Sequence, residues 1–263
     1  MHQENFFMTF YGGDERMIRV ILPDSYNYSD NYYPVLYMFD GQNLFNKRDA
    51  YTGTTWGVRE ALKKLTKTGE SREMIIVGLD NAGDRRLHEY APWDCEFEGE
   101  FIQAEGMEFA DFFANAVVGE IDSRYRTVQD KAHRFVAGSS MGGLISAFTI
   151  LAYPDTFGKA GVFSLASMMA EPQFLEFAEF QGRTEGNQFY IMVGAQEGKN
   201  HTTGRINYNI SNSYINCTLH FMRALLKNGA DPDDMDIIIS AGDSHCEQAW
   251  RKQMPNFIRF LNK

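Results

Sequence analysis

The 263-residue sequence predicts an α/β fold in which a leading antiparallel hairpin joins a mainly parallel, doubly wound sheet. Short apolar runs alternate six times with helical patterns, which is typical of parallel strands covered by helices on both faces. Two apolar-aromatic runs near the start flank a turn and indicate the hairpin. A chain of 263 residues that is 44% hydrophobic can bury one sizeable core, so we expect a single domain over residues 1–263.

Each predicted element follows from its local pattern. The hairpin strands are residues 6–11 and 17–22, separated by Gly12-Gly13-Asp14-Glu15. Continuous apolar runs predict the later strands at 35–39, 74–79, 134–137, 161–164, 189–193 and 235–240. Helical spacing predicts helices at 58–66, 108–125, 144–151, 173–180, 214–227 and 247–261. Pro255 lies inside the last helical pattern and is expected to kink or restart that helix.

Composition narrows the classes of partner and compartment. A formal net charge of −10, with scattered Lys and Arg, argues against nucleic acid, because binding phosphates needs clustered cations. The N-terminus has no basic region followed by an apolar stretch, and no apolar run is long enough to span a bilayer. Three cysteines, Cys95, Cys217 and Cys246, form no C-x-x-C pair and cannot all pair within the chain. We therefore expect a cytoplasmic protein with no membrane partner, and a homo-oligomer stays open.

The pentapeptide Gly138-Ser139-Ser140-Met141-Gly142 joins a predicted strand to a predicted helix. In a G-x-S-x-G turn, the central serine takes a strained conformation with positive φ, and the glycines avoid collisions across the tight turn. Ser140 has this framing, whereas Ser139 does not. The pattern predicts a nucleophilic serine, although a Gly/Ser-rich turn without chemistry can have the same sequence.

Two titratable residues downstream, Glu197 and His245, each follow a predicted strand. The carboxyl ends of parallel strands meet at one edge of a sheet, so these side chains should lie near Ser140. The chain order Ser140, Glu197, His245 is that of α/β-hydrolases, with His245 as the base and Glu197 as the acid that orients it. A solvated loop carboxylate and a surface histidine are the alternatives. Asp243 is a rival acid, but Asp-x-His spacing should turn the two side chains apart in an extended segment.

Three segments carry a specific resemblance: PVLYMFDGQNLF at 34–45, GSSMGG at 138–143 and GDSHCEQAW at 242–250. Together they resemble the putative-esterase family of α/β-hydrolases, over essentially the whole chain from about Phe7. That family includes enterochelin esterases, S-formylglutathione hydrolases, acetyl xylan and feruloyl esterases, and mycolyltransferases.

The resemblance implies a nucleophile at Ser140, a base at His245 and an acid at Glu197. It also implies that backbone N–H groups of Gln42 and Met141 form an oxyanion hole, with no metal or organic cofactor. Such donors, together with the N-terminus of the helix after Ser140, would stabilise the negative charge of a tetrahedral intermediate. An ordinary strand-end turn is the alternative for the segment that contains Gln42.

Substrate contacts are expected from two long loops, residues 80–106 and 194–213, because loops of this length in a compact domain are commonly functional. Aromatic faces stack on ligands while polar groups orient them. On these grounds the predicted contacts are Arg86, Tyr90 and Trp93 of the first loop, and Trp56 is predicted on the same terms. The same aromatic side chains would also suit packing of the first loop onto the body of the protein.

The sequence therefore predicts a serine carboxylesterase that hydrolyses a small acyl or aryl ester, including an ester of a sugar, through an acyl-enzyme on Ser140. Its expected partner is a small-molecule ester. Two enzymatic alternatives use the same serine: an acyltransferase and a siderophore-lactone esterase. The non-enzymatic alternative is an inactive, hydrolase-like binding domain.

Overall fold

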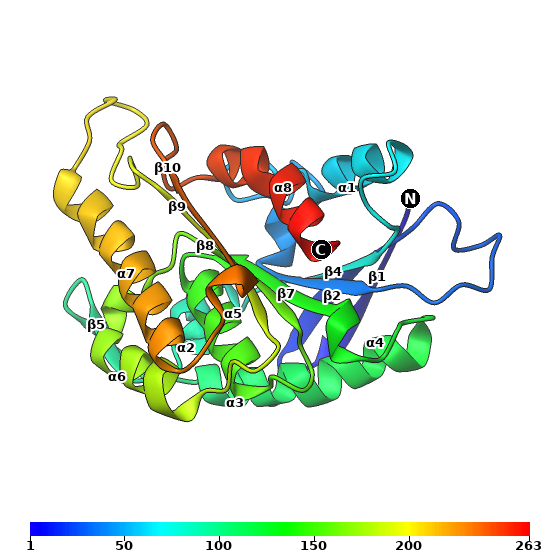
Figure 1. Ribbon diagram of the computed structural model, residues 1–263, viewed down its shortest axis with the longest axis horizontal. Helices are drawn as coiled ribbons and strands as arrows, with labels where there is room; N and C mark the ends of the chain where they lie inside the picture. Colours follow the sequence, from blue (N-terminus) through cyan, green and yellow to red (C-terminus); the bar gives the residue numbers. More distant parts are fainter.

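An eight-stranded sheet runs through the centre of the computed structural model, which describes residues 1–263 (Figure 1). Its strands lie in the order β1-β2-β4-β3-β7-β8-β9-β10. Their bounds are β1 His2–Thr9, β2 Glu15–Leu22, β3 Val35–Phe39, β4 Ile75–Leu79, β7 Arg134–Ser139, β8 Lys159–Phe163, β9 Gln188–Gly194 and β10 Met235–Ser240. β2 pairs antiparallel with both β1 and β4, and all other neighbours are parallel. The predicted fold class is confirmed.

Helices cover both faces of the sheet (Figure 1). Their bounds are α1 Val58–Lys67, α2 Arg86–Tyr90, α3 Gly106–Phe112, α4 Val118–Arg124, α5 Met141–Ala152, α6 Glu171–Glu176, α7 Tyr208–Lys227 and α8 Glu247–Leu261. α1 and α8 pack together on one face, over a cluster of 21 buried residues, and the larger cluster of 45 buried residues lies under helices of the other face. Because both faces are covered, β3, β4 and β8 are buried at every position.

The predicted hairpin is confirmed, but its first strand begins earlier than expected. β1 includes the polar segment from His2 to Asn5, which pairs with β2 in register, His2 opposite Leu22. The apolar-run criterion missed this segment because backbone pairing at a sheet edge does not require apolar side chains. The turn is closed by the Phe10 N–H, which donates to the Asp14 carbonyl, and by the Gly13 N–H, which donates to that of Phe10.

Three later segments differ from the sequence expectations. The loop 80–106 contains α2 and a short hairpin of β5 (Cys95–Phe97) and β6 (Glu100–Ile102). α7 begins at Tyr208 rather than at 214, because the Asn207 side chain accepts hydrogen bonds from two N–H groups of its first turn. α8 runs without interruption through Pro255, so the expected restart does not occur.

Two longer helical segments contain a π-helical turn. Residues Phe113–Val117 join α3 to α4, and Phe177–Gln181 extend α6. The segment predicted at 108–125 is therefore one nearly continuous helical stretch, as expected from its pattern, with a local change of hydrogen bonding in its middle.

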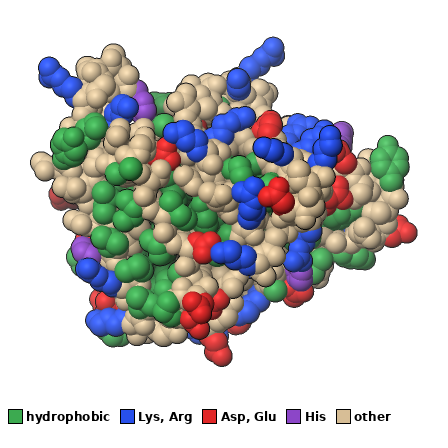
Figure 2. Space-filling model, turned by 45° about the horizontal axis from the view of Figure 1, so that its top comes forward, with side chains coloured by type: hydrophobic (Ala, Val, Ile, Leu, Met, Phe, Trp, Pro, Cys, Tyr) green, Lys and Arg blue, Asp and Glu red, His purple; other side chains and the backbone are tan.

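Charged side chains of both signs are interspersed on the face drawn in Figure 2, and hydrophobic side chains gather toward its left. None of the helices combines the length and the apolar character needed to cross a bilayer.

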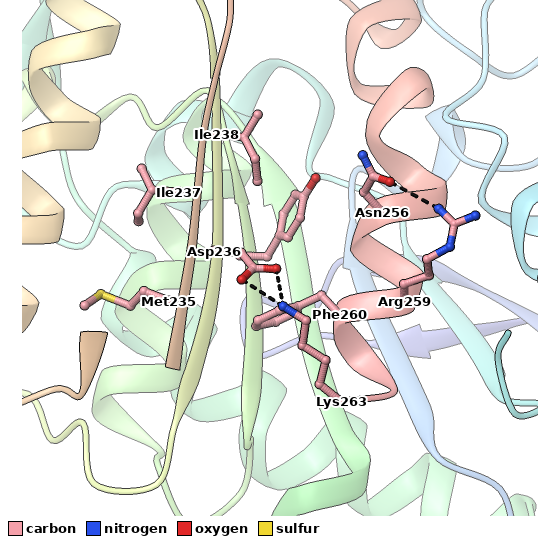
Figure 3. Close-up of a pocket in the computed structure, with 9 residues that line it drawn as sticks. Met235, Asp236, Ile237, Ile238, Asn256, Arg259, Phe260 and Lys263 are labelled. Atoms are coloured by element: carbon pink, nitrogen blue, oxygen red, sulfur yellow. Dashed lines mark hydrogen bonds and ion pairs between the residues drawn. The ribbon is translucent and has the colours of Figure 1, made fainter. Parts of the chain in front are cut away.

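β10 forms one edge of the sheet. A cavity of about 440 Å³ lies between this strand and the last turns of α8. Asp236 pairs with Lys263 in its wall (Figure 3). The cavity lies beside the strand itself. The loop that carries His245 follows the carboxyl end of β10, where loops from several parallel strands meet. The edge cavity is therefore distinct from the site described next.

Candidate active site

Ser140 lies at the sharp turn between β7 and α5, with φ 58° and ψ −122°. Its N–H donates to the Phe163 carbonyl of β8 at 2.9 Å, which fixes the turn against the sheet. A Cβ at Gly138 would come within 2.4 Å of the Gly142 carbonyl oxygen, so only glycine fits there. A Cβ at Gly142 would instead meet the Asp40 carboxylate at 3.1 Å. The strained serine and the glycine requirement at position 138 agree with the sequence prediction.

His245 and Glu197 lie in contact, with 2.7 Å between His245 Nδ1 and Glu197 Oε2. The Glu197 side chain is fully buried, whereas 28% of the His245 side chain is exposed. The other carboxylate oxygen of Glu197 accepts hydrogen bonds from the Ser164 hydroxyl at 2.6 Å and from the Gly194 N–H at 2.7 Å. Trp250 in turn donates its indole N–H to the Ser164 hydroxyl. These contacts fix the Glu197 carboxylate in one orientation behind the imidazole.

The rival acid Asp243 is held elsewhere. Its carboxylate accepts hydrogen bonds from the Ser240 hydroxyl and the Lys252 ammonium group, at 2.7 and 2.6 Å. The side chains of Asp243 and His245 thus make separate contacts, as the Asp-x-His spacing predicts.

Ser140 and His245 line the same cavity, which has a volume of about 640 Å³. The imidazole of His245 lies between two aromatic rings, with ring centroids 4.8 Å from Tyr214 and 5.2 Å from Trp250. Burial raises the pKa of the Tyr214 hydroxyl, and the neighbouring Ser140 side chain acts in the opposite direction. Tyr214 on α7 is therefore adjacent to both residues. The sequence contained no signal for it, because a tyrosine near a helix start is a common core residue.

Two backbone N–H groups are available near Ser140. Met141 is the first residue of α5, and the N–H groups of a first helical turn have no acceptor within the helix. Gln42 lies in the 3-10 turn Gly41–Asn43, where the first N–H to bond back within the turn is that of Asn43. Gln42 lies one residue before Asn43, so its N–H has no acceptor within the turn. Gln42 lines the cavity together with Ser140. An oxyanion hole needs backbone N–H donors of this kind beside the nucleophile.

The turn that contains Gln42 is anchored by Asp40, which has φ 57° and is buried. Its carboxylate receives a two-pronged ion pair from Arg86, at 2.6 and 2.8 Å, and a hydrogen bond from the Asn81 amide at 2.6 Å. Burial lowers the pKa of the Arg86 guanidinium, but the Asp40 carboxylate outweighs this effect and raises it overall. Arg86 also donates to the Ser139 carbonyl at 3.5 Å. One guanidinium thus links the Gln42 turn to the strand that precedes Ser140.

The four predicted substrate contacts have different positions. Trp56 and Tyr90 are 1% and 0% exposed, so the prediction that they touch substrate is wrong. Trp56 packs against Trp250, and Tyr90 packs beneath Asp40, whose N–H donates to its hydroxyl. Trp93 packs edge-on against Phe148, outside the cavity lining. Only Arg86 lines the cavity. The packing alternative therefore holds for the aromatic residues.

Much of the remaining cavity wall comes from residues 43–52, which follow the Gln42 turn after β3. The additional lining side chains are Asn43, Asp49, Tyr51, Thr52, Asn81, Asp84, Glu247 and Trp250. The signal available for them was position alone, since residues that directly follow a parallel strand lie at the edge where ligands bind. Loop length pointed to residues 80–106, of which Asn81 and Asp84 do line the cavity.

The chain is similar to known proteins over most of its length. Residues 11–259 match the protein family described as "Putative esterase". YbbA of Bacillus subtilis (strain 168), an uncharacterized protein, is 25% identical over 250 residues, which cover 94% of this chain and 92% of YbbA.

Solved structures with the same fold have lower sequence identity. A ferulic acid esterase is 18% identical with a TM-score of 0.73, covering 99% of this chain and 97% of the other. The siderophore hydrolase EstA from Aspergillus nidulans is 14% identical with a TM-score of 0.77, covering 99% and 95%. At this identity the likeness establishes the α/β-hydrolase fold, and the family match over residues 11–259 carries the assignment. The chain therefore belongs to the putative-esterase family and is an esterase.

Proposed function

We propose that the protein is a serine carboxylesterase that acts on a small-molecule ester through an acyl-enzyme on Ser140. One observation carries the proposal: a strained serine and a histidine paired with a buried carboxylate line one cavity. An alcohol is a weak nucleophile at neutral pH, so Ser140 needs a neighbouring base. His245 is the histidine of this cavity, and Glu197 holds its Nδ1.

In the proposed reaction, His245 Nε2 accepts the Ser140 hydroxyl proton as Oγ attacks the ester carbonyl carbon. The carbonyl oxygen becomes an oxyanion, which the N–H groups of Gln42 and Met141 stabilise. The imidazolium then returns the proton to the departing alkoxide, which leaves Ser140 acylated. A water molecule, deprotonated by His245, attacks the acyl carbon and releases the acid. These steps require no metal or organic cofactor.

The first test measures hydrolysis of p-nitrophenyl acetate by the wild type and by Ser140→Ala. We expect the variant to lose at least about a thousandfold in kcat, because removal of a nucleophile leaves only binding and oxyanion stabilisation. Ser123→Ala is the matched control and should retain the activity, since Ser123 is an exposed residue of α4 outside the cavity lining. Undiminished turnover by Ser140→Ala would reject the proposal.

A transferase differs from a hydrolase only in the nucleophile that attacks the acyl-enzyme. Product analysis with added alcohol acceptors distinguishes the two, because hydrolysis releases the free acid whereas transfer forms a new ester. The ferulic acid esterase and the siderophore hydrolase with this fold indicate two ester classes to include in a substrate panel.

A further inference from the structure

The cavity around Ser140 has more acidic than basic side chains in its wall. Its lining includes four carboxylates and a single guanidinium, that of Arg86. Two of the carboxylates are neutralised by ion pairs, Asp40 by Arg86 and Asp49 by Arg19. The other two, Asp84 and Glu247, have no basic side chain within ion-pair distance. No basic side chain of the protein therefore balances these two charges of the wall, although Glu247 lies in the first turn of α8, at the positive end of the helix.

Glu247 is the more important of the two unbalanced carboxylates. It is only 7% exposed, whereas Asp84 is exposed to solvent, where water and salt screen its field. One carboxylate oxygen of Glu247 accepts a hydrogen bond from the Thr52 hydroxyl at 2.8 Å. No protein donor lies within hydrogen-bonding distance of the other oxygen, which is not sealed from the cavity. A partly buried charge acts on a ligand more strongly than a surface charge does.

Two aromatic side chains complete this part of the wall. Tyr51 is 92% exposed although it lines the cavity, and its N–H is held by the Asn43 side chain at 2.9 Å. Trp250 lies on the same wall, against the His245 ring. Aromatic faces attract cations, and tryptophan does so most strongly. An aromatic and carboxylate wall favours a positively charged group and disfavours an anion.

We propose that this esterase selects esters that bear a cationic group close to the ester bond, and that Glu247 is the residue that recognises the charge. The inference rests on the proposed function, because the same cavity must hold the ester at Ser140. The positive N-terminal end of α5 begins directly after Ser140 and favours the negative charge that develops on the ester carbonyl oxygen. The negative charge of Glu247 favours a cationic group elsewhere on the same substrate. Esters of amino alcohols have both an ester bond for Ser140 and a cationic group close to it.

The test compares three acetate esters of similar size: acetylcholine, its neutral carbon analogue 3,3-dimethylbutyl acetate, and the anionic 3-acetoxypropane-1-sulfonate. We expect kcat/KM to fall in that order, by about tenfold from the cation to the neutral ester at low salt, because a nearby partly desolvated charge contributes on that scale. Raising the salt concentration should reduce the ratio, since salt screens the interaction.

Glu247→Gln should lower the ratio of cationic to neutral kcat/KM by at least about threefold, and Glu247→Lys should invert the order, because the local charge changes sign. Hydrolysis of the neutral ester by the same variants shows that each one is folded. Glu176→Gln is the matched control, since it removes the same charge from an exposed position on α6 outside the cavity lining. It should leave the ratio unchanged.

Equal hydrolysis of the cationic and neutral esters by the wild type would overturn the proposal, as would a ratio that Glu247→Gln leaves unaltered. If the hydrolysis of p-nitrophenyl acetate still depends on Ser140, either result would leave the proposed serine esterase function unaffected. Hydrolysis that does not depend on Ser140 would overturn the function as well, so the two failures are distinguishable.

Discussion

At the residue scale, Glu197 illustrates how the chemistry depends on contacts from three other parts of the chain. Its carboxylate binds His245 through one oxygen, and Ser164 and Gly194 hold the other. A glutamine at this position would keep the shape but could donate to Nδ1 or leave it without an acceptor. Either case favours the wrong imidazole tautomer for accepting the Ser140 proton.

Glu197→Gln is therefore expected to lower kcat for p-nitrophenyl acetate by up to about 10⁴, the loss that an amide in place of the acid causes in a Ser-His-Asp triad. Steady-state kinetics at several pH values measure the effect. Asp243→Asn serves as the matched control, because its carboxylate binds Ser240 and Lys252 instead of His245. A kcat for Glu197→Gln close to that of the wild type would contradict the assignment of the acid.

Sequence reasoning located Ser140, Glu197 and His245 because each follows a strand whose carboxyl end lies at one edge of the sheet. It failed for Trp56 and Tyr90, because a tryptophan or tyrosine has the same sequence signature in a core as at a cavity wall. Burial distinguishes the two cases, and burial depends on which distant segments pack together.

At the element scale, the central feature is the brace between the Gln42 turn and the nucleophile strand. Arg86 at the start of α2 spans both, through Asp40 and the Ser139 carbonyl. Asp40 holds a left-handed conformation that is unfavourable for a non-glycine residue, so this turn relies on its side-chain contacts.

Replacing Arg86 by methionine should lower kcat at least about tenfold, because the turn that carries the proposed oxyanion donor, Gln42, loses its anchor. It should also cost about 3–5 kcal/mol of unfolding free energy, because the Asp40 carboxylate stays buried without a partner. Urea unfolding and steady-state kinetics measure the two effects. Arg85→Met is the control: Arg85 pairs with Glu105 at the surface, where an ion pair is worth less than about 1 kcal/mol. Equal effects of the two substitutions would refute the brace.

The element pattern was predictable where apolar periodicity was strong. The six parallel strands and the long helices follow from it, whereas α2 and the hairpin of β5 and β6 do not. These short elements have too few residues for a period to show, and tertiary packing stabilises them. Pro255 is a related case, since packing of Met254, Phe257 and Ile258 into the core keeps α8 continuous around it.

At the scale of the whole molecule, the antiparallel edge is tied to the active-site loops by a buried ion pair. Arg16 of β2 and Glu89 of α2 lie 3.2 Å apart, and Glu89 also accepts a hydrogen bond from the Ala82 N–H. Burial raises the pKa of Glu89 to about 7, although Arg16 acts in the opposite direction. The Glu89 carboxyl therefore binds a proton more tightly in the folded protein than in the unfolded chain.

This shift predicts a pH dependence of stability. The favourable effect of the raised pKa is fully present below about 4.5 and is lost as pH rises through about 7, amounting to about 3 kcal/mol. Urea unfolding of the wild type and of Glu89→Gln at pH 5 and pH 8 measures it. We expect the wild type to lose stability relative to the variant over this interval. Parallel pH profiles of the two proteins would contradict the shifted pKa.

The alternation of strands and helices determined the fold class from the sequence, but the character of the cavity could not be read in the same way. Its wall combines residues 40–52, 81–86, 139–140 and 245–250, and its net charge appears only when these segments are brought together. The overall acidic composition gave no indication of where unbalanced carboxylates lie. Glu247 became visible through its burial beside Thr52, two residues after His245.

The central claim is that Ser140 is a nucleophile activated by His245. Fluorophosphonate labelling, with the modified peptide identified by mass spectrometry, tests this most directly. The account predicts one adduct, on Ser140, absent in Ser140→Ala and formed far more slowly in His245→Gln. An adduct on another residue, or labelling of Ser140 at an unchanged rate in His245→Gln, would contradict it.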